Sequence, residues 1–179
     1  MRRANFLEGR LALIVREPGG PPLHERRISN IVLRSGAELV AALFSGKAIT
    51  PINGMSVGIG TTPPAPPYEL SALTTTAPDG TVVLQQATCP VDPAQIETTV
   101  LTDQLKVRVS IRSVMAAGRA VSPDQNLKAV QIGEAALGVL AGDGNSLARI
   151  YNRVVFEPVP KTRDQELALY WEIDFPYGV

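Results

Sequence analysis

The fold is decided by two stretches near the C-terminus, Ile150-Tyr-Asn-Arg-Val-Val-Phe156 and Leu167-Ala-Leu-Tyr-Trp-Glu-Ile-Asp-Phe175. In the second stretch every other residue is large and apolar, from Leu167 through Trp171 to Phe175. This period of two is typical of an antiparallel strand with one buried face. Because a short polar turn separates the two stretches, we expect them to form a long β-hairpin.

Further strands are expected in the rest of the chain. From Gln104 to Met115, apolar residues alternate with Lys, Arg and Ser, which favours a strand with one polar face. Residues 129–140 fit a helix or a strand by periodicity, and the hairpin-type turn Gly142-Asp-Gly-Asn145 after them favours the strand. Shorter strands are expected at about residues 10–16, 27–33, 52–60, 81–88 and 96–101.

One short helix is expected, at about residues 35–45. Its apolar residues recur at helical spacing and are Leu39, Val40, Leu43 and Phe44. Ser35 can cap the start of this helix, and Gly46 can end it. Many strands and one helix predict a mainly β protein, an antiparallel β-sandwich with a helical insertion.

Length and composition favour a single core. The 179 residues, 45% of them hydrophobic, suffice for one domain. Because Glu17-Pro-Gly-Gly-Pro-Pro22 interrupts regular structure, we expect residues 1–26 to form an extended N-terminal arm with a first strand. Residues 27–179 are then the β-sandwich domain.

Charge and cysteine content exclude several classes of function. Lys and Arg total 17, as do Asp and Glu, so net charge gives no attraction to nucleic acid or to an anionic membrane. Cys89 is the only cysteine, which excludes an intrachain disulfide and a multi-cysteine zinc site, and we expect it to be a small buried hydrophobe. The apolar run Leu11–Val15 is too short for a secretory signal, and no segment has the ~18 apolar residues of a membrane span. We therefore expect synthesis in the cytoplasm.

Catalytic motifs are missing. His24 is the only histidine, so catalytic triads and two-histidine metal sites lack a second imidazole. The glycines of residues 54–60 match neither a P-loop nor a dinucleotide fingerprint. Asp143 and Asn145 are better explained by a turn than by calcium. The remaining acid pair is Glu172 and Asp174, which share one face of a strand.

Four aromatic residues are assigned by their strand faces. Trp171 and Phe175 lie on the apolar face, so we expect structural roles for both in the core. Tyr151 and Tyr170 lie on the opposite faces of their strands, where they are candidates for surface contacts in a subunit interface.

Glu134 is a charge within the apolar run of residues 129–140. It can face solvent, pair with a cation such as Arg153 or Lys161, or act as a catalytic carboxylate. Periodicity leaves these three alternatives open.

Several short motifs resemble those of small structural proteins encoded among the tail genes of bacteriophages and of related phage-tail-like contractile injection particles. The resemblance covers about residues 28–175. The motifs are Asn30-Ile-Val32, Gly36-X-X-X-Val-Ala-X-Leu-Phe-X-Gly46, Pro51-Ile-Asn-Gly-Met-Ser-Val-Gly-Ile-Gly-Thr-Thr-X-Pro-X-Pro66, Ile132-Gly-Glu-Ala-Ala-Leu137 and Tyr151-Asn-Arg-Val-Val-Phe-X-Pro-Val-X-Lys161, with the terminal strand already quoted. One motif departs from the group, because its usual Glu-Ala-Gly-Leu-Phe is Glu-Ala-Ala-Leu-Gly here.

This resemblance implies a β-sandwich subunit without catalytic residues or cofactor, located in a virion or a tail-like particle. Glu134 and Arg153 would both be structural. We therefore expect a non-enzymatic tail, baseplate or cap/adaptor protein that binds itself, as a homo-oligomer, and other particle proteins. The arm at residues 1–26 lies outside the resemblance and is a candidate for docking to a neighbour.

The alternative hypothesis is a glycan-binding or receptor-binding module of a tail fibre. It requires an exposed aromatic shelf beside carboxylates, and Tyr170 with Glu172 and Asp174 is the best candidate.

Overall fold

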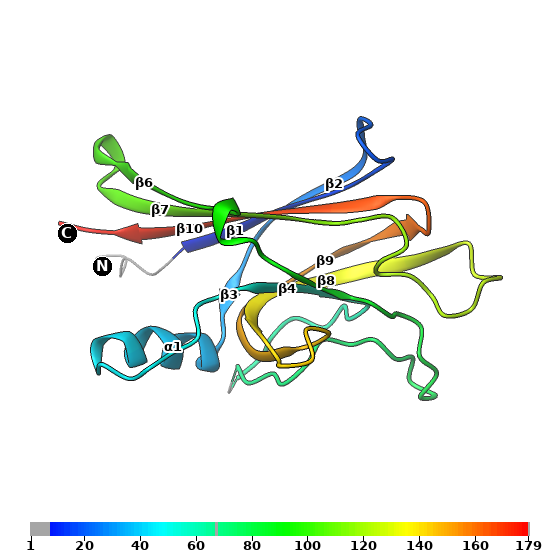
Figure 1. Ribbon diagram of the computed structural model, residues 1–179, viewed down its shortest axis with the longest axis horizontal. Helices are drawn as coiled ribbons and strands as arrows, with labels where there is room; N and C mark the ends of the chain where they lie inside the picture. Colours follow the sequence, from blue (N-terminus) through cyan, green and yellow to red (C-terminus); the bar gives the residue numbers. More distant parts are fainter. Residues whose placement is uncertain (1–7, 67, 179) are drawn as a thin grey trace.

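The computed structural model describes residues 8–66 and 68–178. Two five-stranded antiparallel sheets pack face to face, which confirms the expected mainly β sandwich (Figure 1). Sheet A, the upper layer in Figure 1, has the strand order β2-β1-β10-β7-β6, and sheet B has the order β3-β9-β8-β4-β5.

The bounds of the elements follow the hydrophobic patterns closely. Sheet A consists of β1 (Glu8–Arg16), β2 (Pro22–Ser29), β6 (Ile96–Leu101), β7 (Lys106–Met115) and β10 (Glu166–Pro176). Sheet B consists of β3 (Ile31–Val32), β4 (Gly54–Gly58), β5 (Thr88–Pro90), β8 (Ala129–Leu140) and β9 (Leu147–Thr162). The helices are α1 (Arg34–Phe44) and the 3-10 turns η1 (Pro93–Gln95) and η2 (Thr102–Gln104). Residues 81–88 were expected to be a strand, but before β5 they form only isolated bridges, Thr76 to Val82 and Gln85 to Val121.

The expected terminal hairpin is wrong. β9 and β10 are consecutive in the chain but belong to different sheets, with β9 beside β8 and β3, and β10 between β1 and β7. The true hairpin is β8 with β9, which pairs Ala129 with Thr162 and Leu140 with Leu147. Alternation in the sequence shows which face of a strand is buried. Because strands of both sheets bury that face against the same core, alternation does not show which strand lies beside which.

The N-terminal segment is part of the sandwich from its first described residue. β1 lies between β2 and β10, and its residues Leu11, Leu13 and Val15 are at most 1% exposed. The expected first strand is therefore present, but residues 8–26 are not an extended arm. The rest of the expected arm, residues 1–7, lies outside the described residues.

The core fills the space between the two sheets. β10 contributes Leu167, Leu169 and Trp171, which is 1% exposed, and sheet B contributes residues such as Met55 and Leu137. Trp171 thus lies in the core. Phe175 is half-buried, at the end of β10 where the core opens.

Helix α1 packs across β9, below the left end of sheet A in Figure 1. Leu33 rather than Ser35 occupies the N-cap position, and the Ser35 hydroxyl donates instead to the Ile150 carbonyl. Gly36 allows this contact, because a Cβ there would lie 2.1 Å from the Tyr151 carbonyl oxygen. The helix ends at Phe44, and Gly46, the expected stop, follows two residues later with a φ of +66° that suits glycine.

Candidate binding surface

An apolar groove of about 750 Å³ opens beside α1. One wall is the last two turns of α1, the second is the segment 49–52, and the third is the core side of β6, β7 and β10. None of the described residues that line the groove is charged. We call this feature the apolar groove.

Local sequence builds the rim of the apolar groove. Gly46 turns the chain after α1, with its N–H donating to the Leu43 carbonyl at 3.3 Å, so that the following segment returns alongside the helix. The apolar stripe of α1 starts on the core at Leu39, which is 6% exposed, and ends at Leu43 and Phe44, which are 62% and 90% exposed. The end of α1 therefore presents a leucine and a phenylalanine that no other part of the described chain covers.

Strand β6 borders the apolar groove at the edge of sheet A. Ile96 and Thr98 line the groove, and Val100, two residues further along the same face, is 62% exposed. Sequence reasoning missed this surface. The available signal was an apolar stripe on α1 that continues to the helix end, together with a β-branched strand that carries only one charge.

Tyr151 is buried rather than on the surface. It is 2% exposed, belongs to the core and lies at the floor of the apolar groove, and burial raises the pKa of its hydroxyl. The expectation of a surface contact by Tyr151 is therefore wrong. The register of β9 shifts relative to β8 between Leu137 and Gly138, so simple alternation along residues 150–156 assigns the wrong face.

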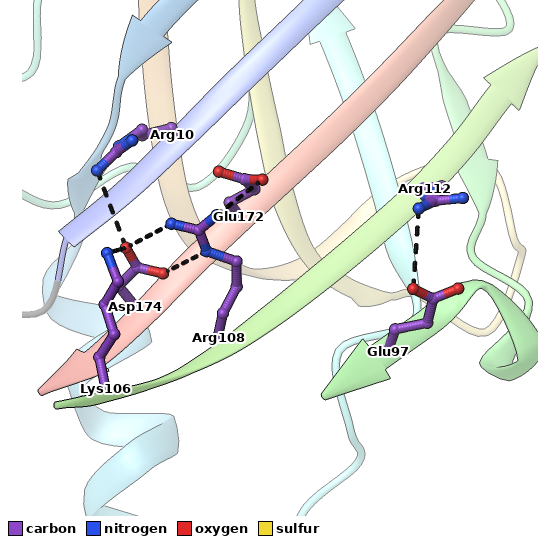
Figure 2. A network of polar contacts seen from close by, with 7 residues as sticks. All are labelled: Arg10, Glu97, Lys106, Arg108, Arg112, Glu172 and Asp174. Carbon is purple, nitrogen blue, oxygen red and sulfur yellow. Dashed lines mark hydrogen bonds and ion pairs between the residues drawn. The ribbon is translucent and has the colours of Figure 1, made fainter. Parts of the chain in front are cut away.

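The outer face of sheet A carries an ion-pair network (Figure 2). Arg108 donates from Nε to Oδ1 of Asp174 at 2.7 Å and from Nη2 to Oδ2 at 3.0 Å, and Lys106 Nζ donates to Oδ2 at 2.7 Å. Arg10 lies 3.9 Å from the same carboxylate. The hydrogen bonds from Arg108, opposed by desolvation and aided by Lys106, lower the pKa of Asp174 to about 2. Asp174 is thus an ionised structural group.

The residues expected to form a glycan shelf lie on this face, but their carboxylates are engaged. Tyr170 is half-buried, Asp174 is held as described, and Glu172 lies 3.3 Å from Arg108 Nη1. A sugar would have to compete with these cations. Both members of the acid pair, Glu172 and Asp174, are thus in ion pairs with Arg108.

Glu134 and Arg153 meet on the outer face of sheet B. The Nε of Arg153 donates to Oε2 of Glu134, and the Nη2 of Arg153 lies 2.5 Å from the same oxygen. The backbone N–H groups of Thr74 and Gly60 donate to the other oxygen, Oε1, at 2.6 and 3.1 Å. The carboxylate is 0% exposed. Of the three alternatives, the geometry corresponds to the structural pair, which ties the loop after β4 onto β8 and β9.

The other residues considered for chemistry are accounted for by structural contacts. Lys161 does not reach Glu134 but donates from Nζ to the Arg119 carbonyl at 2.6 Å, and burial lowers its pKa to about 8. Cys89 is 3% exposed, and burial raises the pKa of its thiol. Asn145 donates its backbone N–H to Asp143 Oδ1 at 2.9 Å in the β8–β9 turn. His24 lies on the edge strand β2.

Within residues 8–66 and 68–178, no cluster of three or more His, Cys, Asp or Glu side chains is placed to hold a metal ion. None of the helices in that part of the chain has the length and apolarity needed to cross a bilayer. Comparison with known protein families, with curated proteins and with solved structures finds no match.

Proposed function

We propose that this chain is a non-enzymatic structural subunit of a phage tail or phage-tail-like particle, and that it assembles through the apolar groove. The observation that carries this proposal is Phe44, 90% exposed at the rim of a groove without a charged lining. Apolar patches of this kind mark interaction sites in soluble proteins, and aromatic residues are frequent anchors in interfaces.

The particle assignment is supported by the resemblance of the motifs within residues 28–175 to tail proteins. Location in the particle, contacts with other tail proteins and self-association belong to the same proposal. Three buried charged groups favour a structural role, because Glu134, Asp174 and Lys161 each have hydrogen-bond partners within the fold.

The test is incorporation into particles. Phe44→Gln is placed in a particle-producing strain that lacks the native gene, and the protein content of purified particles is measured. Burial of a phenylalanine contributes about 1.5–3 kcal/mol, so incorporation should fall by about tenfold or more. Leu127→Gln is the matched control, since Leu127 is 48% exposed and does not line the groove. Equal incorporation of Phe44→Gln and wild type would refute the role of the groove.

The alternative is a glycan-binding module, and one observation favours it. A second cleft, of about 460 Å³, has uncharged hydroxyl and amide side chains in its lining, among them Ser71, Thr75, Gln86 and Ser146, together with apolar side chains such as Leu73 and Leu84. Such groups can both donate to and accept from sugar hydroxyls. A glycan array should then detect binding. Gln86→Ala should remove binding in this cleft, whereas Tyr170→Ala would remove binding only at the separate shelf on the outer face of sheet A. Silence of the wild-type protein on the array would count against this alternative.

A further inference from the structure

The two sheets have four edge strands in the described chain, and three of them are protected against pairing with another strand. β3 has two residues, and β5 has three and ends at Pro90. β2 carries the consecutive polar residues His24-Glu-Arg-Arg27, and the register of β1 against β2 shifts at its Val15/Arg16 end. Short length, proline, charge and bulges are the usual devices that keep an edge from pairing.

β6 has none of these devices. It runs for six residues, Ile96-Glu-Thr-Thr-Val-Leu101, with Glu97 as its single charge. Residues 97–101 pair with β7 on one side, and their backbone groups make no hydrogen bond to any other described segment. The four residues from Glu97 to Val100 are all exposed. The outer edge of β6 is thus an open template for another strand.

We propose that β6 pairs with β6 of a second copy of this chain, antiparallel, about a two-fold axis at Thr98. This inference rests on the proposed assembly function and names its first partner. The two five-stranded A sheets then continue into one another across the axis. Each copy contributes the same backbone groups, as a closed two-fold interface requires.

The side chains select this register. In an antiparallel pair, directly opposite residues lie on the same face. With Thr98 on the axis, Ile96 faces Val100 of the second copy on the groove side, and Thr98 faces its own equivalent. On the outer side Glu97 faces Thr99 of the second copy. Apolar residues therefore meet apolar residues, and no two like charges are opposed. A pair centred on Thr99 would instead place Glu97 opposite Leu101.

The apolar groove supports the same arrangement. Ile96 and Thr98 line it, so the grooves of the two copies meet at the axis and form one longer apolar trough. Val100, which is 62% exposed in the single chain, is covered by Ile96 of the second copy. Pairing through β2 lacks these features, because its edge would bring clustered arginines together.

The test compares two neighbouring threonines by light scattering over a range of protein concentrations. The wild type should be a dimer. Thr98→Lys places two ammonium groups face to face at the axis and should raise the dimer dissociation constant by about a hundredfold. Thr99→Lys adds the same charge opposite Glu97 of the second copy, so this variant should remain dimeric. Mixing Thr98→Lys with Thr98→Glu should restore a dimer, which shows that both variants are folded.

A wild-type monomer at every concentration, or a Thr98→Lys dimer as tight as wild type, would overturn the pairing. The experiments distinguish failure of the β6 pairing from failure of the proposed particle function. A monomer that enters particles in a Phe44-dependent way removes only the two-fold pairing, whereas a Thr98-dependent dimer that never enters particles removes only the particle assignment.

Discussion

Arg153 on β9 donates a hydrogen bond of 2.6 Å from Nε to Oε2 of Glu134 on β8, with the two side chains 9% and 0% exposed. Both oxygens of the carboxylate are used, since the second accepts from the backbone of Thr74 and Gly60. Glycines make room for it, because a Cβ at Gly58 or Gly60 would lie 2.4 or 2.6 Å from Glu134 Oε1. The pair thereby joins the β8–β9 hairpin to the long loop that covers it.

Glu134→Gln should lower the free energy of unfolding by about 3 kcal/mol or more, because it leaves the guanidinium of Arg153 buried without a counter-charge. Chemical denaturation measures this loss. The control is Glu97→Gln, which breaks a 3.8 Å pair with Arg112 between largely exposed side chains and should cost less than about 0.5 kcal/mol. Similar costs for the two variants would show that the Glu134–Arg153 pair has no special weight.

Asp174→Asn should remove an acid-dependent part of the stability. The folded pKa of Asp174, about 2, lies below the ordinary value of about 3.9, so its contribution is present above pH ~4 and is lost as pH falls through ~2. Wild type should exceed the variant by about 2 kcal/mol at neutral pH, and the difference should vanish towards pH 2. Denaturation at a series of pH values tests this, and a pH-independent difference would contradict it.

Lys161→Met should flatten the alkaline side of the stability profile. Burial lowers the folded pKa of Lys161 to about 8, against an ordinary value of about 10.4. Between these values the unfolded chain holds the proton and the folded chain does not, so wild-type stability should rise with pH by about 3 kcal/mol. The variant should lack this rise. Lys128→Met, at an exposed site, should retain it, and equal profiles for both variants would reject the assignment.

Gly36→Ala should destabilise the protein, even though alanine is more favourable than glycine within a helix by about 1 kcal/mol. The new Cβ would lie 2.1 Å from the Tyr151 carbonyl oxygen, which belongs to the backbone of a central strand, so α1 must shift from β9. A net loss of about 2 kcal/mol in thermal or chemical unfolding is expected. The control is Gly142→Ala. Its new Cβ would have no heavy atom within 4 Å, so the free energy of unfolding should change by less than about 0.5 kcal/mol. A neutral or stabilising Gly36→Ala would mean that the helix adapts.

Local pattern predicted the parts of this fold that depend on one segment at a time. The alternation in residues 106–115 and 166–176 predicted strands with a core face, and the turn after residue 140 correctly favoured strand over helix for β8. Gly46 predicted the helix end, because a residue at φ +66° is disfavoured for any side chain with a Cβ. The alternation along β10 also predicted correctly that Trp171 lies in the core.

By itself, then, the sequence determined most of the elements, most of their buried faces and the mainly β class, since periodicity records which side of each segment avoids water. Only the tertiary structure decided that β9 and β10 lie in different sheets, that β1 is an inner strand, and that Tyr151 is buried next to a register shift. It also decided that the stripe of α1 extends past the core at Phe44 and that no other strand of the described chain pairs with the outer edge of β6. These features depend on lateral pairing and on which surfaces meet, and contacts between segments distant in the chain leave no period in either segment.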